Sequence, residues 1–151
     1  MPDIVSPDKR SKMMSGIRGK DTKPEMIIRR ALFKRGFRYR LHVKNLPGKP
    51  DIVFPKYKSV ILVNGCFWHG HNCHLFKLPR SRPEFWNRKI KDTQRRDKTQ
   101  VKKLETLGWR ICIIWECCLK GRESLPINEV VDNIDHWLKG VASSLEIRGY
   151  K

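Results

Sequence analysis

A dense group of metal-binding side chains lies in one short stretch, between residues 66 and 73. Cys66, His71 and Cys73 carry donor atoms that suit zinc, and Cys117 lies far downstream as a candidate fourth ligand. One ion held by all four would join two distant segments of the chain, which strongly restricts the fold. The alternative is three unrelated buried thiols and an imidazole. Four protein ligands would close the coordination sphere, so we expect a structural zinc rather than a catalytic one.

The charge of the chain indicates a polyanionic partner. Its 151 residues include 33 Lys plus Arg against 15 Asp plus Glu, which gives a net charge of +18. Such a surface attracts polyanions. No apolar run approaches the roughly 20 residues that cross a bilayer, so we expect nucleic acid and not a membrane. A basic protein without chemistry, such as a ribosomal one, is the alternative, because charge alone says nothing about catalysis.

Cysteine usage and length indicate the compartment and the number of domains. There are five cysteines, an odd number, and residues 1–20 contain no apolar segment like that of a signal peptide. We therefore expect the cytoplasm, where metal binding explains the thiols better than disulfides do. The length fits a single domain over residues 1–151, with a basic arm at 1–20 and a core at 22–142.

The order of predicted elements indicates an α/β fold. A capping box at 22–25 starts a helix that Gly36 ends. The later patterns predict strands at 37–43, 51–54, 60–63 and 109–115 and helices at 83–107 and 126–141. The long helix between the last two strands suits a right-handed crossover and parallel pairing. We expect a mixed sheet of about four strands, in which three form a meander, flanked by helices.

Two carboxylates are candidate ligands for a hard cation. Asp51 starts a predicted strand beside the predicted central strand, although it could be an ordinary turn aspartate. Glu25 is explained fully by the capping box, yet it could also serve a site if its helix points toward Asp51. Mg²⁺ needs only one or two protein carboxylates. With a loop histidine and a polyanionic substrate, this set is typical of phosphodiester hydrolysis.

Other side chains in or near the 66–73 stretch suit DNA chemistry. His69 is left over by the zinc set, and it could act as a general acid or base or only orient a metal ligand. Phe67, Trp68 and Trp86 are either buried packing or wedges that enter between base pairs. Asp97 is a carboxylate within the apolar stripe of the long helix. Basic residues that could contact phosphates are Lys9, Arg10, Lys12, Arg18, Lys20, Lys89, Lys91, Arg95, Arg96 and Lys98.

A series of motifs in unbroken order connects the chain to a known family. They span residues 10–122 and are Arg10-Ser11-Lys12 with Met14, Leu46-Pro47-Gly48-Lys49-Pro50-Asp51, Gly65-Cys66-Phe67-Trp68-His69, Phe85-Trp86, Leu107-Gly108-Trp109-Arg110 and Trp115-Glu116-Cys117. With these motifs the chain strongly resembles the very short patch repair (Vsr) mismatch endonucleases.

The resemblance implies a restriction-endonuclease-like fold and a specific DNA cleavage. The implied activity is a Mg²⁺-dependent nick in one strand, on the 5′ side of the thymine in a T:G mismatch that arises when 5-methylcytosine deaminates. The implied partners are double-stranded DNA with this mismatch, a MutL-type repair protein and a DNA polymerase. A bacterial cytoplasm at the nucleoid is the implied location. A nick in one strand needs one active site, so we expect a monomer.

The resemblance also implies residue roles. Asp51, with the backbone carbonyl of Val63, resembles the Mg²⁺ site, His69 resembles the acid–base group, and Glu25 resembles a helper near the metal-bound water. The remaining implied roles are zinc binding by Cys66, His71, Cys73 and Cys117, a major-groove wedge of Phe67, Trp68 and Trp86, and a minor-groove contact by Met14.

Three departures from the family pattern bear on the mechanism. Asn64 stands where relatives often carry a second histidine, so either its amide does the same work or that role is dispensable. Val63 replaces a threonine, which is tolerable if only the carbonyl is used. Residues 61–64 lack the acidic-x-Lys motif of restriction nucleases, so the mechanism would depend on Asp51 and His69. The rival hypotheses are a non-catalytic zinc-stabilised DNA-binding module and a zinc-centred hydrolase with an open coordination position.

Overall fold

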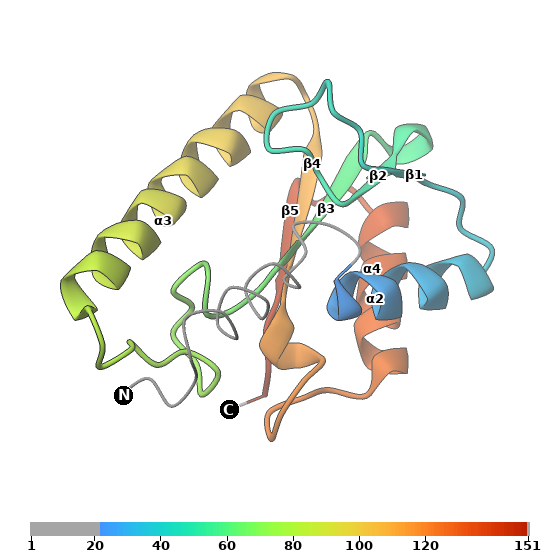
Figure 1. Cartoon of the computed structure of the whole chain (residues 1–151). Helices are drawn as coiled ribbons and strands as arrows, with labels where there is room; N and C mark the ends of the chain where they lie inside the picture. Colours follow the sequence, from blue (N-terminus) through green and yellow to red (C-terminus); the bar gives the residue numbers. More distant parts are fainter. Residues whose placement is uncertain (1–21, 151) are drawn as a thin grey trace.

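The computed structural model describes residues 22–150 as a five-stranded mixed sheet with helices on both faces (Figure 1). The α/β class and the mixed sheet are confirmed. The strands, in spatial order, are β1 (Arg40–Leu41), β2 (Ile52–Phe54), β3 (Ser59–Asn64), β4 (Arg110–Trp115) and β5 (Ser144–Ile147). The helices are α2 (Lys23–Lys34), α3 (Pro83–Thr106) and α4 (Ile127–Lys139). The predicted basic arm and Met14 lie outside the described residues.

Strand pairing follows the length of the connections. β1, β2 and β3 form an antiparallel meander, with residues 42–51 between β1 and β2 and residues 55–58 between β2 and β3. β3 and β4 pair in parallel through α3, and β4 and β5 pair in parallel through α4. The predicted parallel pair across the long helix is therefore confirmed. Among residues 22–150, no helix has the length and apolar character that a membrane span requires.

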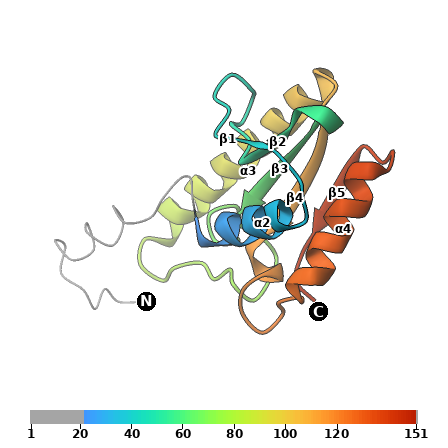
Figure 2. The ribbon, with the colours of Figure 1, turned by 90° about the vertical axis from the view of Figure 1, so that its right-hand side faces the viewer.

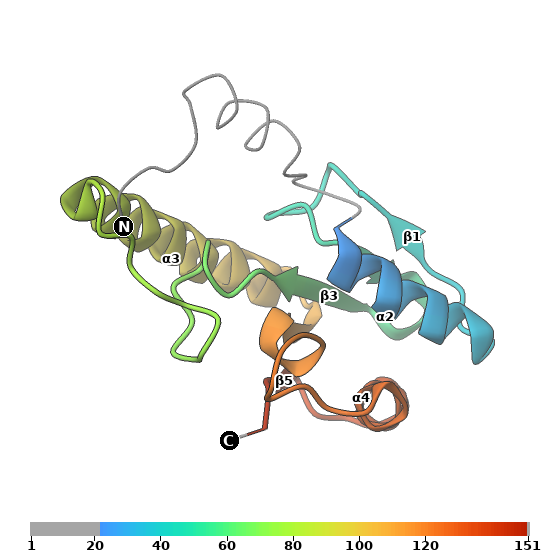
Figure 3. The ribbon, with the colours of Figure 1, turned by 60° about the horizontal axis from the view of Figure 1, so that its bottom comes forward.

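Two separate cores fix the helices to the sheet. On one face, α2 and α4 cover a cluster that includes Leu32, Phe54, Ile114 and Ile134 (Figure 2). On the other, α3 covers a smaller cluster with Val60, Leu104 and Ile111 (Figure 3). Successive residues of a strand point to opposite faces, which explains why the apolar run of β3 contributes to both cores. The long helix is thereby held at one side of the sheet.

The predicted strand at 37–43 is wrong in length. Only Arg40 and Leu41 pair with β2, because β2 has three residues and His42 turns into the left-handed region at φ +54°. The alternation still describes the side chains, since Phe37 is buried and Arg38 is exposed. A period of two therefore predicted which side chains face the core but not how far the backbone pairing extends.

The sheet has one strand more than we predicted. β5 covers four residues, whose burial alternates between exposed positions and partly or fully buried ones. A four-residue stretch after a helix contains too few positions for a period of two to be distinguished from a loop. Its place beside β4 is instead set by parallel register, with Ile114 opposite Ile147.

One edge of the sheet collects the segments singled out above. Because β3 and β4 are parallel with Asn64 opposite Trp115, the loops that follow them leave the sheet at the same edge (Figure 1). β2 is antiparallel to β3, so Asp51, just before β2, lies at this edge too. In open α/β sheets the carboxyl ends of the strands are where ligands bind.

Candidate active site and metal centre

A cleft of about 1290 Å³ opens at this edge and brings the predicted catalytic residues together. Its lining includes Glu25 from α2, Asp51 before β2, Val63 and Asn64 from β3, His69 from the following loop and Asp97 from α3. These side chains come from four regions that are separated in the sequence, since His69 lies in the loop directly after β3. The fold therefore builds one polar cleft from residues that were singled out independently.

Asp51 and Glu25 form a buried pair of carboxylates. The backbone N–H of Val63 donates to Oδ2 of Asp51 at 2.7 Å, and Glu25 in the first turn of α2 is only 2% exposed. Burial, together with the charge and hydrogen bonding of Glu25, raises the pKa of Asp51 to about 8. Two carboxylates forced together out of water favour either a shared proton or a cation. This site can therefore bind a hard divalent ion.

The capping box thus explains only part of what Glu25 does. Its backbone N–H lies 3.5 Å from the Oγ1 atom of Thr22, as an N-terminal cap requires. Its side chain, however, lies beside Asp51 and lines the cleft. In the structure, the first turn of α2 points toward Asp51, which was one of the two alternatives for Glu25. For Val63, the contact present is through its N–H, and the use of its carbonyl stays a prediction.

His69 has a partner that sequence reasoning missed. Its Nδ1 atom lies 2.5 Å from Oδ2 of Asp97 on α3. A carboxylate on Nδ1 fixes the ring and makes Nε2 the nitrogen left for proton transfer. The available signal was the position of Asp97 within an apolar stripe, which indicated a buried face but no partner.

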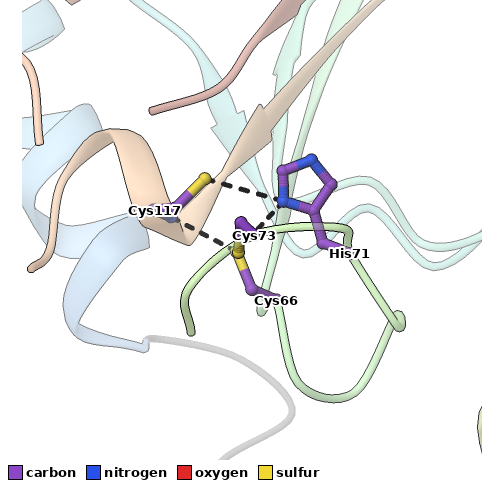
Figure 4. Close-up of side chains that lie close together, drawn as sticks. All are labelled: Cys66, His71, Cys73 and Cys117. Atoms are coloured by element: carbon purple, nitrogen blue, oxygen red, sulfur yellow. Dashed lines mark hydrogen bonds between the residues drawn. The ribbon is translucent and has the colours of Figure 1, made fainter. Parts of the chain in front are cut away.

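The four predicted zinc ligands lie together beside this cleft (Figure 4). Their donor atoms are all within 4.8 Å of one another. The Nδ1 atom of His71 lies 3.5 Å from Sγ of Cys66 and 3.6 Å from Sγ of Cys117. Tetrahedral zinc bonds of about 2.0 to 2.3 Å place ligand atoms at separations of this size. Three thiols and one imidazole therefore fit a metal ion of the zinc type.

The surroundings of the four ligands favour a bound cation. Burial raises the pKa of Cys66 and Cys117, so closely spaced thiolates require a positive ion. The N–H of Cys117 donates to Sγ of Cys66 at 3.3 Å, and the N–H of Gly149 donates to Sγ of Cys117 at 3.2 Å. The ring of His71 stacks on Trp115 at 4.0 Å. These contacts hold the ligands and stabilise sulfur in its ionised form.

The three predicted wedge aromatics form one cluster at the mouth of the cleft. Phe67 lies 5.2 Å from Trp68 and 5.5 Å from Trp86 between ring centroids, and Trp68 and Trp86 are 5.8 Å apart. All three are half-buried, and Phe67 and Trp68 line the cleft. Phe76 and Phe85 extend the cluster and were not predicted. These rings pack together and also reach solvent, so the arrangement has features of both alternatives.

The outer face of α3 is strongly basic. The five predicted phosphate contacts on this helix are all exposed, namely Lys89, Lys91, Arg95, Arg96 and Lys98. The inner face carries Ile90 and Leu104, both buried. The helix therefore joins a positive surface to the cleft that Asp97 lines.

Comparisons with known proteins identify the family to which the sequence is similar. A family profile described as "DNA mismatch endonuclease Vsr" matches residues 2–75. The chain is 40% identical over 147 residues to "DNA mismatch endonuclease Vsr" of Escherichia coli (strain K12), covering 97% of this chain and 94% of that relative. It is 45% identical over 125 residues to "Type II nicking enzyme V.XorIIP" of Xanthomonas oryzae pv. oryzae, covering 83% and 92%. It is also 45% identical over 122 residues to "Type II nicking enzyme V.NmeAIP" of Neisseria meningitidis serogroup A, covering 81% and 87%.

Proposed function

The chain belongs to the DNA mismatch endonuclease Vsr family, and we propose that it nicks one DNA strand on the 5′ side of the thymine in a T:G mismatch. Such mismatches arise by deamination of 5-methylcytosine, and the nick starts very short patch repair. The observation that carries the proposal is the cleft in which Glu25, Asp51 and His69 meet. A DNA-binding module without chemistry would leave this buried carboxylate pair without a function.

The carboxylate pair is the proposed Mg²⁺ site. Asp51, with the carbonyl of Val63, would hold the ion, which supplies positive charge to the scissile phosphate when bound. Glu25 lies next to Asp51 and helps to orient the attacking water. Asn64 lines the same cleft, where its amide can hydrogen-bond to substrate in place of a histidine.

His69 is the proposed acid–base group. Hydrolysis forms a bond from a water oxygen to phosphorus and breaks a phosphate ester bond, so protons must leave the water and reach the departing oxygen. Asp97 holds Nδ1 of His69, and Nε2 is then free to take up or deliver a proton in the cleft. The carboxylate also stabilises the ring when it is charged.

The sulfur-rich cluster is the proposed structural zinc site. Cys66, His71, Cys73 and Cys117 would use all four positions of the ion, which leaves none for substrate. A bound zinc cross-links the loop after β3 to the turn after β4. The loop that carries His69, Phe67 and Trp68 is thereby held in one conformation.

The substrate is double-stranded DNA with a T:G mismatch. Phe67, Trp68 and Trp86 enter the stack from the major groove, and Met14 contacts the minor groove. The exposed basic residues of α3 contact phosphates, which orients the duplex without reading its sequence. The protein acts as a monomer at the bacterial nucleoid, with a MutL-type protein and a DNA polymerase as repair partners.

A nicking assay on matched duplexes tests this proposal. Wild-type protein with Mg²⁺ should nick the thymine strand of a T:G duplex and leave the T:A duplex intact. Asp51→Ala should bind the T:G duplex and nick it at least about 10³-fold more slowly, because it removes the proposed metal ligand. Asp92→Ala, which changes an exposed aspartate paired with Arg95, should retain the wild-type rate. Wild-type nicking by Asp51→Ala would exclude the proposed metal site, and equal cleavage of both duplexes would exclude mismatch specificity.

A further inference from the structure

The backbone at Gly70 is in direct contact with α3. Gly70 lies between His69, the proposed acid–base residue, and His71, a proposed zinc ligand, and its φ is +61°. A Cβ atom added there would lie 2.5 Å from Nε2 of Gln94 and 2.6 Å from Cγ2 of Ile90. Both distances are shorter than the contacts that a Cβ atom makes in real proteins, and the left-handed φ also disfavours a side chain. Gly70 therefore permits α3 to pack against the peptide backbone itself.

The Gln94 side chain uses this close approach to hold the loop. Its Nε2 atom donates to the carbonyl of His69 at 3.1 Å and to the carbonyl of Gly70 at 3.3 Å. An amide NH₂ has two hydrogens, so one side chain can satisfy both acceptors. These carbonyls belong to the two peptide groups on either side of the Gly70 Cα atom. Gln94 therefore fixes both peptide planes of the most adaptable residue in the loop.

Gln94 and Asp97 are one turn apart on α3 and hold the same histidine in different ways. Asp97 contacts the imidazole at Nδ1, whereas Gln94 contacts the backbone that carries it. A ring held only at Nδ1 could still pivot if the peptide at Gly70 changed its conformation, since glycine has access to a wide range of φ and ψ. Fixing the Nε2 atom in the cleft thus requires both contacts.

We propose that Gln94 is a positioning residue that orients His69 through the two carbonyls flanking Gly70. This inference rests on the proposed acid–base function of His69. Gln94 is half-buried on the inner face of α3. Among the described residues, it is not one of those that line the cleft. It therefore acts on the reaction through His69 and not by contact with DNA. A displacement of about 1 Å at a reacting group can reduce a rate by about 10²-fold.

Two substitutions separate hydrogen bonding from packing. Gln94→Met keeps the length of the side chain but has no N–H to donate, and Gln94→Glu keeps the shape but directs a carboxylate at two carbonyl oxygens. We expect the single-turnover nicking rate to fall about tenfold for Gln94→Met and about 10²-fold for Gln94→Glu. DNA affinity and zinc content should stay at wild-type values. A residue that only packs would tolerate Gln94→Glu at least as well as Gln94→Met, so equal or reversed effects would overturn the inference.

A neighbouring residue on the same helix supplies the matched control. The Thr93 hydroxyl donates to the carbonyl of Lys89 in its own helix, at 3.1 Å. Thr93→Val removes this hydroxyl and should leave the nicking rate unchanged. His69→Ala is measured in the same assay. Full activity of His69→Ala would overturn the proposed function, whereas an inactive His69→Ala beside wild-type rates for both Gln94 variants would overturn the inference about Gln94 alone.

A measurement on the wild-type protein keeps the inference testable if the variants fail to fold. The chain has only two glutamines, Gln94 and Gln100, so ¹⁵N-glutamine labelling gives two side-chain amide signals. The Nε2 protons of Gln94 should exchange with water about tenfold or more slowly than those of free glutamine, because both are hydrogen-bonded. Exchange at the rate of free glutamine would overturn the inference.

Discussion

Two sites with opposite donor chemistry lie at one edge of the sheet. The cleft holds two buried carboxylates, and burial together with the neighbouring charge of Glu25 raises the pKa of Asp51 to about 8. The neighbouring cluster holds three thiols and an imidazole, all four close enough to bind one ion. Oxygen donors suit a hard, exchangeable cation, and sulfur donors suit a soft, permanent one. In the first site, the burial and mutual repulsion of two carboxylates are unfavourable, and catalysis can use them. The second site can stabilise the loop between the two.

That loop divides its residues between the two sites. Cys66, His71 and Cys73 point to the metal cluster, whereas Phe67, Trp68 and His69 line the cleft or its mouth. A single ion can therefore position the aromatic and acid–base groups without taking part in chemistry. The comparison predicts that damage to the sulfur cluster removes both stability and nicking, whereas damage to the cleft lowers the nicking rate and leaves the cluster intact.

The largest expected effect is the loss of the metal cluster in Cys117→Ser. Removing one thiolate should abolish stoichiometric zinc and lower the free energy of unfolding by about 5 kcal/mol or more, since metal binding contributes directly to folding. Metal analysis and thermal unfolding measure both. Nicking should disappear with the ordered loop.

A second buried thiol provides the control for this change. Cys118 is adjacent and buried but is not one of the four ligands. Cys118→Ala should keep one zinc per chain and lose only the small free energy of a buried sulfur. Zinc retention by Cys117→Ser, or zinc loss in Cys118→Ala, would contradict the division of the two sites.

Much of this arrangement could be predicted because its signals are local. The capping box at Thr22, the apolar run of β3 and the long amphipathic pattern of α3 each depend on neighbouring residues. The metal ligands could be predicted from donor type and spacing alone, without knowing how their loops fold.

The rest depends on contacts between distant segments. Asp97 and Gln94 are ordinary polar residues of a helix until α3 packs against the loop after β3, some 25 residues earlier in the chain. β1 ends early because its partner β2 is short. β5 forms because one side of β4 is available for backbone pairing with residues 144–147. A linear pattern contains no information on which edge or loop will be nearby.

The second prediction concerns a change in the cleft that should lower the nicking rate and leave the metal cluster intact. His69→Ala should reduce the single-turnover nicking rate by about 10³-fold, as expected for the loss of a general acid or base. Its zinc content and melting temperature should stay near wild type, because the side chain faces Asp97 and not the cluster. His136→Ala, an exposed histidine on α4, should have no effect. A His69→Ala protein that loses zinc would show that the two sites are not separable.

The smallest expected effect concerns stability and pH. Asp51 has an ordinary pKa of 3.8 and a folded pKa of about 8. Below about pH 3 both states are protonated, so the group does not affect stability. As the pH rises toward 8 the unfolded chain ionises first, and wild-type stability is lost progressively. Asp51→Asn does not titrate, so without Mg²⁺ its advantage in stability over wild type should grow by at least about 2 kcal/mol between pH 5 and pH 8.

Thermal unfolding at both pH values measures this difference in stability, and a second measurement with Mg²⁺ tests its cause. A cation bound at the carboxylates favours ionised Asp51, so added Mg²⁺ should stabilise wild type and leave Asp51→Asn unchanged. The two proteins should then approach each other at pH 8. Asp92→Asn, at an exposed position, should show no pH-dependent difference. If the stability difference between Asp51→Asn and wild type became smaller as the pH rises, the expected pH dependence would be wrong. The ionised carboxylate pair would then stabilise the fold.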